Sequence, residues 1–219
     1  DGTPERRPGS PLQQIAEGFN FIFSNQLFMV FMCLSYSGMF FGMAHLQLMP
    51  AFAGLLESSE AGYGLLISAT GVGSVIGTVL VGYFQNSRRI GAFILSCSGL
   101  SAVSVFVFAA VTGYLPVGKT TYAIAILALI AGSMMSSMFM IASMTILQLK
   151  VPDHLRGRVM GFYGITYSLM PLGGLLAGWI ASVSSAPVAI FVAVTFYLLI
   201  IAVVAITQRE VRLLSAEAS

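Results

Sequence analysis

Six long apolar stretches, none of which contains Asp, Glu, Lys or Arg, constrain the fold of this chain more than any other feature of the sequence. They cover residues 27–50, 64–84, 92–112, 122–149, 159–183 and 188–206. A helix of about 20 apolar residues crosses a hydrocarbon core of about 30 Å, and it satisfies its backbone hydrogen bonds internally. The sequence therefore predicts an all-α membrane protein with six transmembrane helices.

The composition agrees with this class. Hydrophobic residues make up 57% of the chain and charged residues only 8%, whereas soluble domains contain about 25% charged residues. The net charge is +2 and no basic patch carries interleaved aromatic residues, so we expect no nucleic-acid partner. Cys33 and Cys97 lie singly within apolar stretches, without CxxC spacing. We therefore expect small buried hydrophobic residues, no metal site and no cofactor.

We expect three parts along the chain. Residues 1–26 form a polar linker and an amphipathic lead-in helix at the membrane surface, in which Leu12, Ile15 and Phe19 recur at helical spacing. Residues 27–207 form the transmembrane bundle, and residues 208–219 form a tail. The start DGTPERRPGSP is polar and lacks an initiator Met. We interpret the chain as a fragment that was cut from a longer one inside a linker.

The positions of the basic residues predict the orientation in the membrane. Six spans place both termini on one side, together with the second and fourth connecting loops. Nine of the ten Lys and Arg residues then share that side: Arg6, Arg7, Arg88, Arg89, Lys150, Arg156, Arg158, Arg209 and Arg212. Only Lys119 lies opposite. By the positive-inside rule, both termini of this multi-pass protein face the cytoplasm.

The six spans divide into two sets of three. Spans one and four carry most of the polar, Met and Tyr residues, spans two and five carry the glycines, and spans three and six are nearly featureless. This correspondence indicates a three-plus-three repeat of inverted topology. Within span two, Gly71-Val72-Gly73 superficially resembles part of a phosphate-binding loop, but no strand pattern precedes it and no Lys follows it. We interpret Gly73 and Gly77 as a helix-packing face.

The turn between spans four and five resembles a known family. Gln148, Val151-Pro152-Asp153 and Leu155-Arg156-Gly157-Arg158-Val159-Met160-Gly161 are similar to the loop between helices ten and eleven of major facilitator transporters. The similarity is greatest to the drug and siderophore exporter branch, which includes enterobactin and macrolide exporters. Gly82, Asn86 and Arg88-Arg89 resemble the family's G-x-x-x-D-x-x-G-R-R loop, with Asn86 in the acidic position.

This resemblance covers the chain from Leu12 onward and implies half of a twelve-helix major facilitator fold, namely helices seven to twelve. It also implies a bacterial inner (plasma) membrane and, as partner, the N-terminal six-helix half of the same transporter.

Two helical faces are candidates for the wall of a substrate cavity. Tyr36, Phe40, Met43 and Gln47 recur at i, i+4, i+7 and i+11 on span one, and Ser133, Ser137, Met140 and Met144 form a similar face on span four. The resemblance implies that the first helix of each triplet lines the central cavity. Flexible Met and aromatic walls suit bulky, mostly apolar cargo. The alternative is that both faces are ordinary packing.

Few other residues could carry chemistry. His45 is the only ionisable residue well inside a span, so it serves either substrate or proton binding or a hydrogen-bonded structural role. No Asp or Glu lies within a span, and the resemblance then places the coupling residue in the other half. The charged loop residues either set topology only or also hold a cytoplasmic gate: Arg88, Arg89, Asp153, Arg156 and Arg158.

From these observations we expect a secondary active exporter of small amphipathic molecules, such as drugs or siderophores, that works by alternating access and is present here as the C-terminal half. One alternative is a six-span membrane receptor or assembly subunit that transports nothing. Another is an intramembrane enzyme. We disfavour the enzyme, because the spans contain no carboxylate pair, Ser–His pair or HExxH motif.

Overall fold

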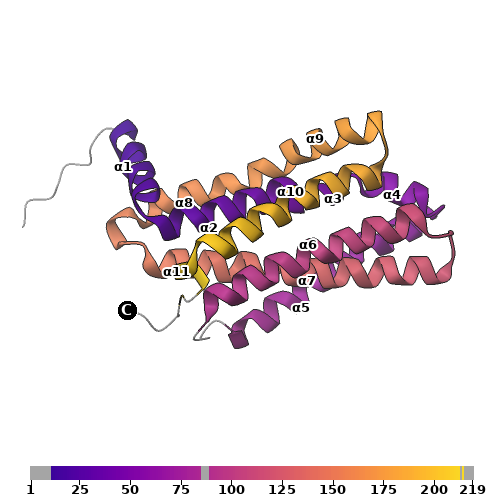
Figure 1. Ribbon diagram of the computed structural model, residues 1–219, viewed down its shortest axis with the longest axis horizontal. Helices are drawn as coiled ribbons and strands as arrows, with labels where there is room; N and C mark the ends of the chain where they lie inside the picture. The colour runs from indigo at the N-terminus through magenta and orange to yellow at the C-terminus, as the bar shows by residue number, and fades with distance from the viewer. Residues whose placement is uncertain (1–10, 85–88, 213, 215–219) are drawn as a thin grey trace, which may run out of the picture.

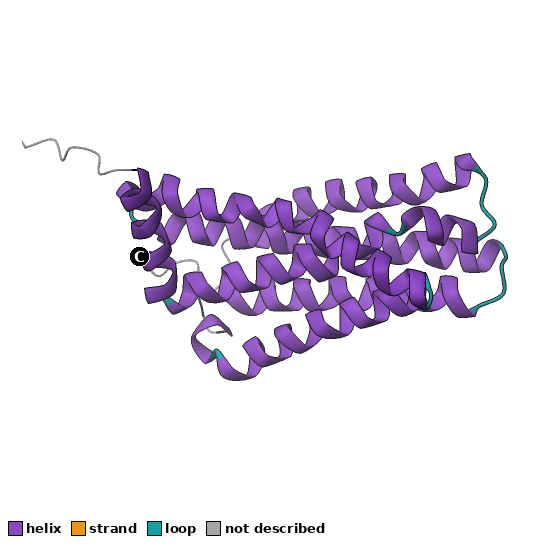
Figure 2. Cartoon of the chain, turned by 90° about the horizontal axis from the view of Figure 1, so that it is seen from above, coloured by secondary structure: helices purple, strands orange, loops and turns teal. Residues whose placement is uncertain are grey.

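The computed structural model describes residues 11–84, 89–212 and 214, and all regular elements among them are helices (Figures 1 and 2). Six helical segments of this described part are long and apolar enough to cross a membrane. They are Gln26–Gln47, Glu60–Phe84, Ile90–Tyr114, Lys119–Lys150, Asp153–Val183 and Ala186–Thr207. Each overlaps one of the six stretches expected from the sequence, so the all-α, six-span prediction is confirmed.

Two of the spans are interrupted and four are continuous helices. The first span consists of α2 (Gln26–Ser37), the π-helix η1 (Gly38–Gly42) and α3 (Ala44–Gln47). The fifth consists of η2 (Asp153–Leu155), α8 (Arg156–Gly164), the 3-10 helix η3 (Ile165–Ser168) and α9 (Leu169–Val183). The continuous spans are α5 (Glu60–Phe84), α6 (Ile90–Tyr114), α7 (Lys119–Lys150) and α10 (Ala186–Thr207). The short helices outside the spans are α1 (Pro11–Ser24), α4 (Met49–Leu55) and α11 (Arg209–Arg212).

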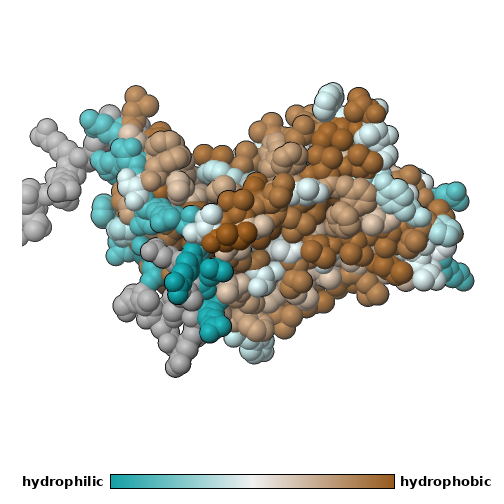
Figure 3. Space-filling view, viewed as in Figure 1, coloured by the Kyte–Doolittle hydropathy of each residue, from teal (hydrophilic) through white to brown (hydrophobic). Residues whose placement is uncertain are grey.

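The ends of the bundle differ from its middle in polarity. The helices α1 and α11 lie at the same end as the beginning of α8, and α4 lies at the opposite end (Figure 1). Hydrophobic residues cover most of the middle of the molecule, and hydrophilic residues gather at the two ends (Figure 3). A membrane bundle needs this distribution, because its middle contacts lipid tails.

Helix packing follows the expected repeat. The second span, α5, packs on the fourth, α7, just as α9 of the fifth span packs on η1 and α3 of the first. The third span, α6, packs on α7, and the sixth, α10, packs on the first span. The third and sixth spans also pack on each other. These contacts agree between the two triplets, as in a three-plus-three repeat, whereas, among the described residues, the fifth and sixth spans also pack on each other without a comparable contact between the second and third.

Glycines allow the closest of these contacts. A Cβ atom at Gly73 or Gly77 of α5 would overlap the backbone of Ile130 or Met134 of α7. In the other triplet, a Cβ at Gly173 of α9 would overlap the backbone of Phe40. Small residues permit such backbone approach between membrane helices. The interpretation of Gly73 and Gly77 as a packing face is therefore confirmed.

The lead-in helix also forms where the sequence predicts it. In α1, the side chains of Leu12, Ile15, Phe19 and Phe23 are exposed, whereas Ile22 is buried. Because α1 lies across one end of the bundle (Figure 1), this exposed apolar side is available to the membrane interface.

Candidate functional site

The first two residues of the expected face on span one line a large pocket. Tyr36 and Phe40 border a space of about 620 Å³ between α1, α2 and the fifth span. The Tyr36 hydroxyl donates a hydrogen bond of 2.7 Å to the carbonyl oxygen of Phe162 on α8. Tyr36 is thus held against the fifth span, and the pocket lies beside this contact.

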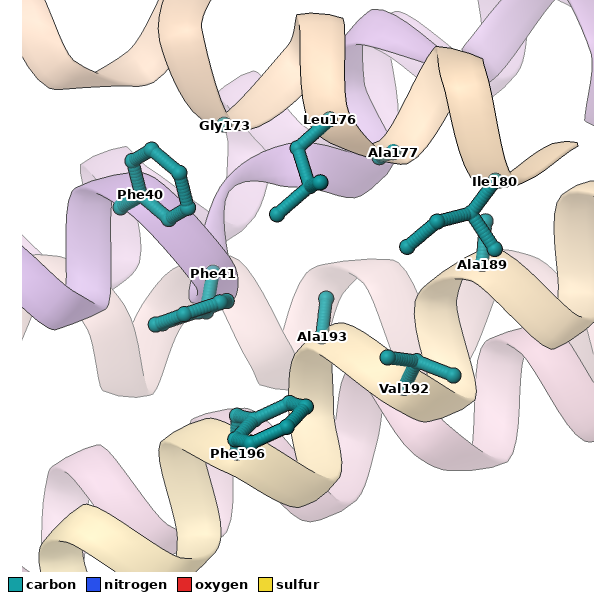
Figure 4. Close-up of a pocket in the computed structure, with 10 residues that line it drawn as sticks. All are labelled: Phe40, Phe41, Gly173, Leu176, Ala177, Ile180, Ala189, Val192, Ala193 and Phe196. Carbon is teal, nitrogen blue, oxygen red and sulfur yellow. The ribbon is translucent and has the colours of Figure 1, made fainter.

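Phe40 also borders a second pocket, of about 270 Å³, between η1, α9 and α10 (Figure 4). Leu176 and Ile180 of α9 extend into this space above Phe196 of α10 (Figure 4). The Phe41 ring stacks on Phe196 at a centroid distance of 5.9 Å and closes one side. Every residue that lines this pocket is apolar or glycine.

The other two residues of the expected face have different neighbours. Met43 borders a very small cavity inside the bundle, together with Ser136 and Met140 of α7. Gln47 is exposed, and its side chain lies directly over Gly174 of α9. The first two residues of this face therefore line the two larger pockets, Met43 lines the small cavity that also borders the fourth span, and Gln47 lines none of these three.

The expected face on span four lies along α7. Ser133 and Ser137 are half-buried, and Met144 is exposed. Met140 is the residue that meets span one, beside Met43, and its carbonyl oxygen accepts a hydrogen bond of 3.3 Å from the Tyr163 hydroxyl. The two faces thus meet at Met43 and Met140. Their role in substrate binding stays a prediction.

Sequence reasoning missed two tyrosines that join the spans. Tyr163 of α8 reaches α7 through the bond to Met140. Tyr197 of α10 is buried in a span that was expected to be featureless, and it lines the same small cavity. Its hydroxyl oxygen lies 2.8 Å from the place of a Cβ on Gly38, and its ring lies against Gly42. Gly38 and Gly42, four residues apart in span one, could have indicated that a large side chain packs there.

His45 is packed inside the bundle. Its side chain is 4% exposed, and Nδ1 lies 3.0 Å from the carbonyl oxygen of Gly42, which accepts the Nδ1 proton. Its ring stands edge-on to Phe108 at a centroid distance of 6.4 Å. These are the contacts of a hydrogen-bonded structural residue. The substrate or proton role stays a prediction.

The charged loop residues form two kinds of ion pair. Arg156 pairs with Asp153 at 2.7 Å on an exposed turn. Arg158 pairs with Glu17 of α1, so it links the fifth span to the lead-in helix. Arg89 also has an interaction partner. The candidate Arg88 and the motif residue Asn86 lie outside the described residues.

One expectation about the cysteines is wrong. Cys97 is buried as expected, but Cys33 is exposed and lines the pocket of about 620 Å³. The cause is that Cys33 lies on the side of α2 that faces this pocket, beside Tyr36. Among the described residues, no three His, Cys, Asp or Glu side chains gather as a metal ion would require.

Comparison with known proteins gives one match. The sequence model of the Major Facilitator Superfamily matches residues 2–172 and also residues 48–217. Neither the search of curated proteins nor the search of solved structures found a match.

Proposed function

We propose that this chain, which belongs to the major facilitator superfamily, forms the C-terminal six-helix half of a secondary active transporter that exports small amphipathic molecules. Membership of this family of transporters and the six apolar spans support membrane transport. The direction of transport, the kind of cargo and the status of a half are our inferences. The status of a half rests on the outer faces of the second and fifth spans, the kind of cargo rests on the side chains of the candidate faces, and the direction of transport rests on the resemblance to exporters.

A second face on α5 carries the proposal. Opposite the side that packs on α7, small and polar residues recur at alternating spacings of four and three. They are Gly64, Ser68, Gly71, Val75, Thr78 and Gly82, and all six are exposed. A Cβ at Gly64, Gly71 or Gly82 would meet nothing within 4 Å. We call this stripe the open face of α5.

The fifth span repeats the pattern. Its stripe has the same spacing and consists of Gly157, Gly161, Gly164, Ser168, Pro171, Leu175 and Gly178. A Cβ at any of these four glycines would also meet nothing within 4 Å. Small residues at such spacing are typical of helix contacts in membranes. Two equivalent open faces on one bundle support a second bundle as their occupant, and we propose the N-terminal half of the same transporter.

The candidate face on span four supports amphipathic, mostly apolar cargo. It combines hydroxyl and Met side chains at helical spacing, namely Ser133, Ser137, Met140 and Met144. Flexible apolar walls accept bulky molecules without one fixed geometry. The apolar stretches contain no Asp or Glu, so we place a coupling carboxylate in the other half.

Two neighbouring glycines test the proposed interface. Gly73→Leu should destabilise the chain, because the new side chain would overlap the Ile130 backbone. Gly71→Leu should leave the folded yield and thermal unfolding of the 219-residue chain unchanged, because its Cβ meets nothing. In the twelve-helix protein, Gly71→Leu should lower dye export from proteoliposomes about fivefold or more, since overpacking costs about 1–3 kcal/mol.

Two results would contradict the proposal. Wild-type export by the twelve-helix Gly71→Leu variant would mean that the open face of α5 is no interface. Export of the dye by the 219-residue chain alone in liposomes would mean that the chain is not a half.

A further inference from the structure

Three pockets follow one another along one side of the fifth span. The first, of about 500 Å³, lies between α1 and α8 and is lined by Gln14, Arg158 and their neighbours. It shares Phe162 and Ile165 with the pocket of about 620 Å³. That pocket in turn shares Phe40 with the pocket of about 270 Å³. Because neighbouring pockets share lining residues, we treat the three as one site and call it the α8–α9 groove.

The two deeper pockets of the groove lie beside the open face of the fifth span and are not part of it. Their wall includes Ile165, Leu169 and Leu176, and the far part turns toward α10. Gly164, Ser168 and Leu175 of the open face each precede one of these residues, and one residue is about 100° around a helix. Only the first pocket borders the open face, at Gly157 and Gly161, so a second bundle on that face leaves the two deeper pockets uncovered.

Polarity changes sharply along the groove. In its depth, the hydroxyls of Tyr36 and Ser37 already donate to backbone carbonyl oxygens, with Ser37 reaching Cys33 O at 2.7 Å. The remaining residues that line the two deeper pockets are apolar apart from the thiol of Cys33. The charged side chain that can bind the polar end of a ligand lies instead at the mouth, where Arg158 lines the first pocket. A ligand that fits has one polar end and a long apolar part.

Arg158 is suited to bind a phosphate at this mouth. Its side chain is 27% exposed and pairs with Glu17 through one terminal nitrogen. A guanidinium group has five N–H donors in a fork, so this ion pair leaves further donors. The pocket of about 500 Å³ that Arg158 lines leaves room for a headgroup.

We propose that the α8–α9 groove binds a glycerophospholipid, with its phosphate at Arg158 and one acyl chain in the two deeper pockets. The distance along the helix supports this occupant. Arg158 and Leu169 are separated by about 16 Å at a rise of about 1.5 Å per residue, which matches one leaflet of a hydrocarbon core of about 30 Å. A bound chain fills the space between α1, α2 and α8 and so supports the position of the lead-in helix.

Lipid retention by the purified 219-residue chain in detergent, measured by native mass spectrometry, tests this site. The probes are dioleoylphosphatidylethanolamine, dioleoylphosphatidylglycerol, dioleoylglycerol and inorganic phosphate. We expect one bound molecule of either phospholipid. Dioleoylglycerol should bind about tenfold more weakly, because it lacks the phosphate that forms charge-assisted hydrogen bonds. Inorganic phosphate should not bind, because it lacks the acyl chain whose burial contributes to the affinity. Equal binding of dioleoylglycerol, or binding of inorganic phosphate as tight as that of the lipids, would overturn the proposal.

Matched variants locate the lipid. Arg158→Gln should weaken phospholipid binding about tenfold, whereas Glu17→Gln breaks the same ion pair and should leave binding unchanged or tighter. Ile165→Trp fills the groove from an exposed position and should displace the acyl chain while the thermal unfolding midpoint is kept. Unchanged binding in both Arg158→Gln and Ile165→Trp, or a loss in Glu17→Gln as large as that in Arg158→Gln, would refute the site.

Discussion

Among single residues, two buried serines on neighbouring helices differ in what their hydroxyls contact. Ser101 donates a hydrogen bond of 3.0 Å to the Gly132 carbonyl oxygen and so joins α6 to α7. The Ser143 hydroxyl has no partner among the described residues. Ser101→Ala should lower the free energy of unfolding by about 0.6 kcal/mol, a usual value for such bonds between membrane helices.

Ser143→Ala is the matched control, and it should leave the free energy of unfolding unchanged or raise it, because it removes a buried, unpaired hydroxyl. Both values can be measured by reversible unfolding of the purified chain in mixed micelles. A larger loss of stability in Ser143→Ala than in Ser101→Ala would contradict this ranking.

Gly38 and Tyr197 give a second prediction at this scale. Gly38→Ala places a methyl group 2.8 Å from the Tyr197 hydroxyl oxygen, and overpacking of this kind costs about 1–3 kcal/mol. Tyr197→Phe removes that oxygen atom and should restore much of the loss in the double variant. A double-mutant cycle of unfolding free energies measures the coupling. Additive effects of the two changes would show that the residues do not interact.

The π-helix explains why only the first two residues of the face predicted on span one line the same pocket. Tyr36 and Phe40 share a pocket, as their spacing of four predicts. Beyond them, Met43 N donates to Gly38 O, five residues back, so this turn contains one more residue than an α-helical turn. Residues after it are rotated relative to an extrapolated α-helical face. The break lies where Tyr197 of α10 packs on Gly38 and Gly42, a contact that local spacing does not encode.

Among the elements, α1 and α8 are joined by the pair of Arg158 and Glu17. One terminal nitrogen of the guanidinium contacts the Glu17 carboxylate. Lys keeps the charge but lacks the planar group and its remaining N–H donors. In the twelve-helix protein, Arg158→Lys should therefore keep expression and insertion but lower export severalfold.

Arg156→Lys is the control for this element-level prediction. Arg156 pairs with Asp153 on an exposed turn, where an ion pair contributes little. The export rate of the Arg156→Lys variant should equal that of the wild type at equal expression. If Arg158→Lys also exports normally, both arginines serve topology only.

Hydropathy was sufficient to predict the elements, but not how they meet. Each span and the lead-in helix formed where apolar periodicity placed it, because a membrane helix satisfies its backbone within itself. The exposure of Cys33 depends instead on how α1 crosses over α2 and α8. Such contacts join residues that are far apart in sequence, as in the pair of Glu17 and Arg158, and no local pattern carries them.

For the whole molecule, the positions of the basic residues predict the orientation in the membrane. In a Cys33→Ala and Cys97→Ala background, a cysteine at exposed Ser59 should react with a membrane-impermeant thiol reagent added to intact cells. A cysteine appended after Ser219 should react only after the cells are opened, because the basic residues predict cytoplasmic termini. Labelling of the appended cysteine in intact cells would reverse the topology.

The order of the helices along the chain also determines when each helix–helix contact can form during synthesis. Gly73 of α5 packs on Ile130, which is synthesised about 57 residues later. Phe40 of the first span packs on Gly173, which is synthesised about 130 residues later. At about 5–20 residues per second, the first span must stay in the bilayer for roughly 7–26 seconds before α9 exists. Throughout that interval, lipid or the insertion machinery has to shield its glycines and hydroxyls. The first of these six spans is therefore among the last of them to complete its native contacts.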